Sequence, residues 1–155
     1  MDKIDLHIIK LVQENSKLTN LELSKKIGLS PAPTLERVKK LEKSGIIESY
    51  HAKRSSKKLG LNVKAFVLVS LELKEYRDLN HLVAEIEAIP EIVECYNITG
   101  ASDLMLKIIA SDMEAYEELI FMKLSRIAEI NRIQTMIVLS TFKDSDVLPF
   151  NYSAS

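Results

Sequence analysis

Basic residues gather around one stretch of this sequence, LSPAPTLERVKKLEKSGII, residues 29–47. Ammonium and guanidinium groups bind phosphates, and several of them along one helical face can follow the backbone of a nucleic acid. Four more follow in the segment HAKRSSKK, namely Lys53, Arg54, Lys57 and Lys58. The pattern indicates polyanion binding, although a charged face that only contacts water explains the helix when it is taken alone.

Residues that could perform catalysis are scattered along the chain. His7, His51 and His81 lie far apart, without the spacing of metal ligands. Cys95 is the only cysteine, which excludes an internal disulfide and a paired-cysteine metal cluster. No nucleophile–base pair or glycine-rich phosphate loop is visible among only 4 glycines. We therefore expect no catalytic residue, no cofactor and no metal, and an amino-acid-binding enzyme domain is the weakest hypothesis.

The segment TGASD, residues 99–103, is a second candidate for binding chemistry. Gly100 permits positive φ or a close approach of the backbone, and the carboxylate of Asp103 suits an ammonium group. A tight connection between two antiparallel strands, with Asp103 as a turn residue, explains the same residues. Both interpretations stay open at this stage.

Charge divides the chain into two parts. Up to Gly60 there are thirteen Lys/Arg against seven Asp/Glu, a net charge of +6, and the remainder carries −7. This asymmetry predicts a polyanion-binding part, residues 1–60, joined to a part with another task, residues 61–155. Two oppositely charged surfaces that attract each other are the alternative.

Membrane and secretory functions are not expected from the apolar pattern. The longest apolar-rich runs are too short to span a bilayer. The N-terminus, MDKIDLHIIK, carries acidic residues where a secretion signal needs an apolar core. We expect a cytoplasmic protein without a membrane partner.

Two short helices are expected at the N-terminus. Apolar residues recur at helical spacing over residues 2–15. In KLTNLELSKKIG, Thr19 and Glu22 form a capping box, and Gly28 supplies the stop. A first helix and a shorter second helix follow from these patterns.

A third helix is expected from Ser30, because Pro31 suits the first helical position and Pro33 still lies in the first turn. Together with the second helix it forms a helix-turn-helix pattern, whose last helix lies in the DNA major groove. Its predicted buried stripe consists of Leu35, Val38 and Leu41. After Gly45 we expect a short β-hairpin, or wing, that leads into the basic segment.

The second part of the chain shows patterns of both strands and helices. Strands are expected over residues 61–74, 92–99, 104–110 and 130–142, with helices over residues 79–89 and 112–124. The order βαββαβ is the ferredoxin-like arrangement, so the whole chain is of the α+β class. One face of such a sheet stays open, which favours dimerisation.

With these features, the chain resembles the Lrp/AsnC family of transcriptional regulators. The run LSPAPTLERVKKLEKSGII is the most specific, and DKIDLHIIKLVQEN, TGASDLMLKI and RIQTMIVLSTFK extend the resemblance over nearly the whole chain. The resemblance implies a winged helix-turn-helix domain and a ferredoxin-like domain that assembles the oligomer and binds small effectors, often amino acids. The implied partners are double-stranded DNA, further copies of the chain, as dimers that form tetramers or octamers, and an effector.

The resemblance also implies site residues. Residues facing or holding DNA would be Thr19, Lys25, Ser30, Ala32, Glu36, Arg37, Lys40 and Lys43. The effector pocket, across an interface between dimers, would contain Gly100, Ala101, Ser102, Asp103, Thr135 and Ile137. The family loop is usually Gly-Asp-aromatic-Asp, and here Ala101 replaces the first acid and Ser102 the aromatic residue. An effector-independent, architectural DNA-wrapping protein is therefore the alternative function.

Overall fold

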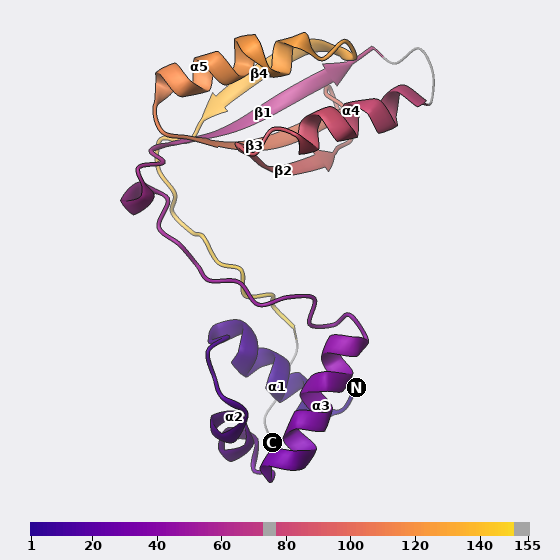
Figure 1. Ribbon diagram of the computed structural model, residues 1–155, viewed down its shortest axis with the longest axis vertical. Coiled ribbons are helices and arrows are strands. Elements are labelled where there is room, and N and C mark those ends of the chain that lie inside the picture. The colour runs from indigo at the N-terminus through magenta and orange to yellow at the C-terminus, as the bar shows by residue number, and fades with distance from the viewer. Residues whose placement is uncertain (73–76, 151–155) are drawn as a thin grey trace. The chain divides into compact units, whose positions relative to one another are not determined.

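The protein, seen as a computed structural model, consists of two compact units (Figure 1). The structure describes residues 1–72 and 77–150. One unit contains Met1–Arg54 and the described part of the C-terminal segment that begins at Lys143; the other is Ser55–Phe142. The chain passes from the first unit to the second between Arg54 and Ser55, and the C-terminal segment returns to the first unit.

The N-terminal unit is a bundle of three helices, α1 (Lys3–Glu14), α2 (Asn20–Ile27) and α3 (Pro31–Lys43). A capping box of Asp2 and Asp5 begins α1, and the predicted box of Thr19 and Glu22 begins α2. Gly28 ends α2 in the left-handed conformation, with φ of 71°. The three predicted helices are confirmed, and they bury a small core of Ile8, Leu23 and Leu41.

Helix α3 begins at Pro31 as predicted, but its buried face differs from the predicted one. Thr34 is fully buried, whereas Leu35 is 42% exposed, so the prediction that Leu35 lies in the buried stripe is wrong. The hydroxyl of Thr34 donates to the carbonyl of Ser30 at 2.9 Å, which satisfies the buried polar group. The stripe therefore follows Thr34, Val38 and Leu41.

The predicted β-hairpin after Gly45 is absent, because no strand is formed in residues 44–62, all of which the structure describes. A hairpin of two isolated strands is only marginally stable without a third strand or a helix to cover it. The chain instead bends back once, where the hydroxyl of Tyr50 donates to Glu42 at 2.8 Å. The basic segment then follows, and it ends in the short 3₁₀ helix η1 (Lys57–Leu59).

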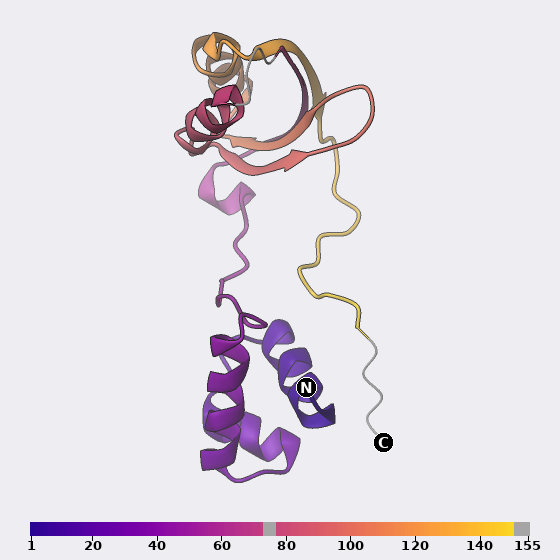
Figure 2. The ribbon, with the colours of Figure 1, turned by 90° about the vertical axis from the view of Figure 1, so that its right-hand side faces the viewer.

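The second unit is a four-stranded antiparallel sheet in the order β2-β3-β1-β4. Both of its α-helices lie on the same face of the sheet (Figure 2). The βαββαβ order predicted from the sequence is confirmed, with elements β1 (Val63–Leu71), α4 (Arg77–Glu87), β2 (Ile92–Asn97), β3 (Leu104–Ala110), α5 (Met113–Met122), the 3₁₀ helix η2 (Leu124–Arg126) and β4 (Ile130–Ile137).

The core of this unit lies between the sheet and the two helices. Alternate residues of β1 and β3 are buried and pack against residues such as Leu82 and Leu119 of the helices. The intervening residues on the opposite face are only half-buried, among them Phe66, Leu68 and Met105. The strand β4 ends at Ile137, earlier than the predicted end at residue 142, and its last residue pairs with Ala65 of β1.

We expect Leu41→Ala to lower the free energy of unfolding by about 2–4 kcal/mol, because Leu41 is 3% exposed in a core of few residues. Urea unfolding followed by circular dichroism measures this loss. Leu35→Ala is the matched control and should cost less than about 1 kcal/mol. Equal losses in the two variants would contradict the buried face described for α3.

Candidate DNA-binding surface and effector loop

One side-chain hydrogen bond joins α2 to α3, and two buried hydroxyls are satisfied locally. Ser24 and Thr34 are buried, and each hydroxyl donates to a nearby backbone carbonyl, at 2.8 and 2.9 Å. The side-chain amide of Asn20 donates to the carbonyl of Pro31 at 2.8 Å, which ties the start of α2 to the start of α3. The start of α3 is thus held at α2, and the residues of α3 opposite Thr34 and Leu41 are exposed.

The exposed face of α3 carries most of the predicted DNA contacts. A helix turns about 100° per residue, so positions 32, 36, 39 and 43 point furthest from the buried Thr34 and Leu41. Seven predicted residues are exposed on α2, on α3 or at their caps: Thr19, Lys25, Ser30, Ala32, Glu36, Lys40 and Lys43.

Lys39 shares this face, although the predicted contacts do not include it. It is exposed and lies one turn before Lys43. With the buried stripe predicted through Leu35, Lys39 falls at the edge of the exposed face. With the stripe observed through Thr34, the helical spacing of 100° per residue places Lys39 within that face.

Thr19 is already committed to the cap of α2. Its hydroxyl accepts the backbone N–H of Glu22 at 3.2 Å and donates to the carboxylate of Glu22 at 2.8 Å. Hydrogen bonds from the backbone and the hydroxyl of Thr19 lower the pKa of Glu22. A contact of Thr19 with a phosphate would therefore compete with the capping box.

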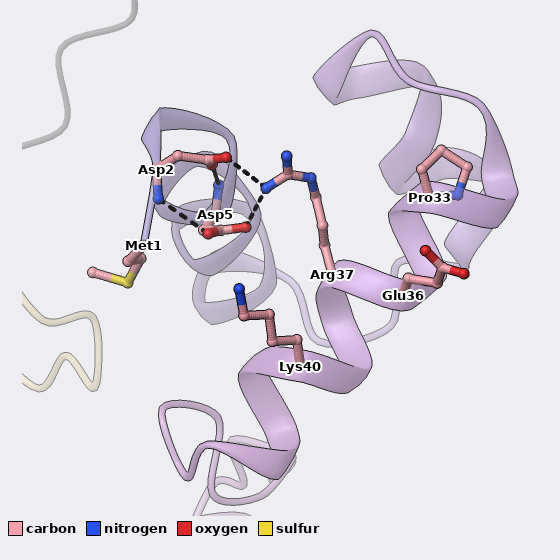
Figure 3. Close-up of a pocket in the computed structure, with 7 residues that line it drawn as sticks. All are labelled: Met1, Asp2, Asp5, Pro33, Glu36, Arg37 and Lys40. Atoms are coloured by element: carbon pink, nitrogen blue, oxygen red, sulfur yellow. Dashed lines mark hydrogen bonds and ion pairs between the residues drawn. The ribbon is translucent and has the colours of Figure 1, made fainter.

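Arg37 differs from the other predicted contacts, because its guanidinium group is paired within the protein. Nη1 lies 2.7 Å from Oδ2 of Asp2 and 2.7 Å from Oδ1 of Asp5 (Figure 3). Asp5 is buried, and its other carboxylate oxygen accepts the backbone N–H of Asp2 at 3.0 Å. Arg37 thus neutralises a buried carboxylate and ties the start of α1 to α3.

The same ion pairs shift the pKa values of Asp2 and Arg37. The backbone N–H of Asp5, and then the guanidinium of Arg37, lower the pKa of Asp2. Hydrogen bonds to the two carboxylates raise the pKa of Arg37. The pairing therefore stabilises the charged forms of Asp2 and Arg37 relative to their neutral forms.

A surface pocket of about 500 Å³ lies between the start of α1 and α3 (Figure 3). Its lining contains three acidic and two basic side chains, so its charge does not select one kind of small ion. Among the described residues, no group of three or more His, Cys, Asp or Glu is placed to hold a metal. The pocket is lined by Met1, Asp2, Asp5, Pro33, Glu36, Arg37 and Lys40.

Arg37→Ala should lower the free energy of unfolding by about 1–3 kcal/mol at pH 7, because the buried carboxylate of Asp5 loses its partner. The loss should shrink in acid. The folded pKa of Asp2 lies below its ordinary value of 3.8, so its pairing stabilises the fold above that pH and is lost as the pH falls through the folded pKa. Urea unfolding of both proteins at pH 7 and pH 3 measures the difference.

Lys40→Ala is the control for this prediction, since no ion pair of Lys40 is found in the part of the chain that the structure describes. Its unfolding free energy should stay within about 0.5 kcal/mol of the wild type at both pH values. A loss in Arg37→Ala no larger than that in Lys40→Ala would contradict the anchoring role of Arg37.

Asp103 in the predicted effector loop holds two strands together. The backbone N–H of Leu71 donates to Oδ2 of Asp103 at 2.8 Å, and the N–H of Asp103 donates to the carbonyl of Val69 at 2.9 Å. Gly100 has a φ of 127°, which an L side chain rarely adopts. Asp103 is exposed, and among the described residues only Oδ2 forms a hydrogen bond, so Oδ1 is available to a ligand.

Thr135 and Ile137 are not brought next to this loop within one chain. They pair with Val67 and Ala65 of β1 from the β4 side, whereas Asp103 bonds to β1 near its end, on the β3 side. The hydroxyl of Thr135 also bonds to that of Tyr116 at 2.6 Å. The predicted effector residues therefore form two groups, on different edges of β1.

Family models match the two halves of this fold separately. The model described as winged helix-turn-helix DNA-binding matches residues 1–48, and the Lrp/AsnC ligand binding domain matches residues 64–148. The chain belongs to the Lrp/AsnC family. It is thus a DNA-binding transcriptional regulator and not an enzyme.

Curated and structural relatives of this Lrp/AsnC regulator agree over almost its full length. It is 38% identical to the transcriptional regulator AzlB of Bacillus subtilis (strain 168), over 97% of this chain and 96% of that protein. It is 36% identical to the leucine-responsive regulatory protein of Haemophilus influenzae, over 96% and 89% of the two chains.

A solved structure gives the same result for the Lrp/AsnC fold. The transcriptional regulator NMB0573 of Neisseria meningitidis, crystallised as a complex with L-Met, matches with a TM-score of 0.93 and 34% identity, over 97% of each chain. In the present regulator, none of the helices in the described residues has the length and apolar character needed to cross a bilayer.

Proposed function

We propose that this regulator binds specific double-stranded DNA through the exposed face of α3. The observation that carries the proposal is the exposed face opposite Thr34 and Leu41, which ends in basic residues. Ser30, Ala32 and Glu36, in its N-terminal half, are assigned to base edges in the major groove. The lysines are assigned to phosphates, and they are Lys25, Lys39, Lys40 and Lys43.

Two sequence-based assignments are refined by the geometry of the N-terminal unit. The ion pairs of Arg37 with Asp2 and Asp5 favour an indirect role, in which Arg37 sets the position of α3. The capping bonds of Thr19 with Glu22 likewise favour an indirect role, in which Thr19 sets the position of α2. Direct phosphate contacts are therefore assigned first to the exposed lysines.

The regulator is also proposed to act as a homo-oligomer in the cytoplasm. Both described helices of the second unit cover one face of the sheet (Figure 2). On the other face, Phe66, Leu68 and Met105 are only half-buried in a single chain. A second copy that packs on this face would bury these residues. Paired α3 helices would then read paired half-sites.

The proposed effector is an amino acid, bound between copies of the chain. NMB0573 was crystallised with L-Met, and its similarity to this chain covers the second unit. The loop of Gly100, Ala101, Ser102 and Asp103 supplies a carboxylate for the ammonium group. Since Thr135 and Ile137 lie on another edge of β1, they would complete the pocket from a neighbouring copy.

A second candidate function is architectural, in which the protein wraps DNA without an effector. It is favoured by the hydrogen bond between Asp103 and Leu71, because this bond explains Asp103 without a ligand. The loop also lacks the acid and the aromatic residue of the usual family pattern at Ala101 and Ser102. Effector binding is therefore the property that separates the two candidates.

The double variant Lys40→Ala/Lys43→Ala should bind the DNA upstream of its own gene at least tenfold more weakly than the wild type. If both lysines contact phosphates, the slope of log K against log salt concentration should become shallower by about 1.8, at about 0.9 for each phosphate. Fluorescence anisotropy across a salt series measures both quantities.

The control for this experiment is Arg132→Ala, which removes an exposed basic residue from β4 in the other unit. The DNA affinity of Arg132→Ala should lie within a factor of about two of the wild-type value. Its slope of log K against log salt concentration should match that of the wild type. A shuffled duplex of the same composition tests specificity. Unchanged binding by Lys40→Ala/Lys43→Ala would refute the assignment of these two lysines to DNA phosphates.

Asp103→Asn should weaken binding of L-methionine or L-leucine by tenfold or more, because it removes the negative charge. The new side-chain carbonyl can still accept the N–H of Leu71, so the thermal stability should be preserved. Isothermal titration calorimetry with both amino acids, together with a thermal melt, separates binding from folding.

Asp112→Asn is the matched control, because Asp112 is an exposed carboxylate at the cap of α5. Its effector affinity should equal that of the wild type. Binding that survives unchanged in Asp103→Asn would remove Asp103 from the site. A wild-type protein that binds none of the twenty amino acids would favour the architectural candidate.

A further inference from the structure

The C-terminal segment after β4 lies on the DNA-binding unit. The described residues from Lys143 to Phe150 cluster with Met1–Arg54 rather than with the sheet. Two separate sets of contacts hold this segment, one on α1 and one on the basic segment that follows α3. We refer to residues 143–148 as the tail.

The first contact is a reciprocal pair of hydrogen bonds at the end of α1. The side-chain amide of Gln13 donates to the carbonyl of Leu148 at 3.2 Å, and the N–H of Leu148 donates to Oε1 of Gln13 at 3.1 Å. One side chain thus satisfies both backbone groups of Leu148, as a neighbouring strand would do. This pair fixes where the tail meets α1.

The second contact occupies a basic residue. The ammonium group of Lys53 donates to the carbonyl of Asp144 and lies 3.6 Å from Oδ1 of the same residue. The side chains of Lys53 and Asp144 are 57% and 58% exposed, so the pair is accessible to a competing anion. A carboxylate and a carbonyl therefore stand where a phosphate oxygen could bind.

The neighbours of Lys53 in the basic segment differ from it. Arg54, Lys57 and Lys58 are exposed, and within residues 1–72 and 77–150 none of their side chains is found in an ion pair. The tail also contains a second acid, Asp146, which is exposed and, in the same described ranges, has no ion pair. Only one acid of the tail is thus directed at one base of the segment.

We propose that the tail is an intramolecular competitor of the DNA backbone, with Asp144 occupying Lys53 until a phosphate displaces it. The proposal rests on the proposed DNA binding by this unit. Gln13 keeps Asp144 close to Lys53, so the effective concentration of the carboxylate is high. An exposed ion pair contributes little by itself, so the tail adjusts DNA affinity and does not prevent binding.

The test compares Asp144→Asn with Asp146→Asn, which change the net charge equally. At about 50 mM salt, Asp144→Asn should bind DNA about threefold to fivefold more tightly than Asp146→Asn, by fluorescence anisotropy. In a Lys53→Ala background the two variants should bind alike. An equal gain in both single variants would overturn the proposal, because it would reflect net charge alone.

Hydrogen exchange of the tail is a second measurement. It reports the docking of the tail directly and does not depend on comparing the DNA affinities of the charge variants. DNA should speed the exchange of peptides covering residues 143–148 in the wild type, and Gln13→Ala should speed it without DNA. Unchanged exchange on addition of DNA, in a protein that binds DNA normally, would overturn the competition but leave the proposed DNA binding intact.

A failure of the DNA-binding proposal gives a different result. The wild type would then bind no duplex at any salt concentration, and the competition would fail with it. The exchange difference between the wild type and Gln13→Ala would still report whether the tail is docked. The two failures are therefore distinguishable.

Discussion

The buried carboxylate of Asp5 is the constraint on which the N-terminal unit depends. A charged group taken out of water needs a partner, and Arg37 of α3 supplies it at 2.7 Å. The other oxygen of the carboxylate closes the capping box of α1. This ion pair thus joins α1 to α3, in addition to the core that Ile8 and Leu41 share. The bond from Asn20 to the carbonyl of Pro31 joins α3 to α2, so the exposed face of α3 is set by the packing of its opposite face.

Much of this fold could be predicted from local patterns. The prolines at the start of α3, the box of Thr19 and Glu22 and the stop at Gly28 act through neighbouring backbone groups, which sequence spacing describes well. The predicted buried stripe of α3 is wrong, because a pattern of apolar residues passes over the hydroxyl of Thr34. That hydroxyl is satisfied within its own helix, and the bond makes Thr34 suitable for the core.

The candidate site was less predictable, because its character depends on contacts between distant residues. Nothing in the spacing around Arg37 shows that Asp2 and Asp5 lie beside it. The bond from Leu71 to Asp103 joins residues that are distant in sequence in the same way. The missing hairpin after Gly45 has a similar cause, since an apolar pattern cannot reveal that no further element covers it. The positions of the basic and loop residues could be predicted, but their partners could not.

The return of the chain to its first unit has a practical consequence for anyone who modifies this protein. An affinity tag or fluorescent fusion placed after residue 150 would follow a segment that Gln13 holds at α1, and not a strand of the sheet. A fragment that ends at Arg54 would contain all three helices but lose the segment that Gln13 and Lys53 hold. An isolated DNA-binding unit of this protein is therefore best studied both alone and with the C-terminal segment added as a peptide.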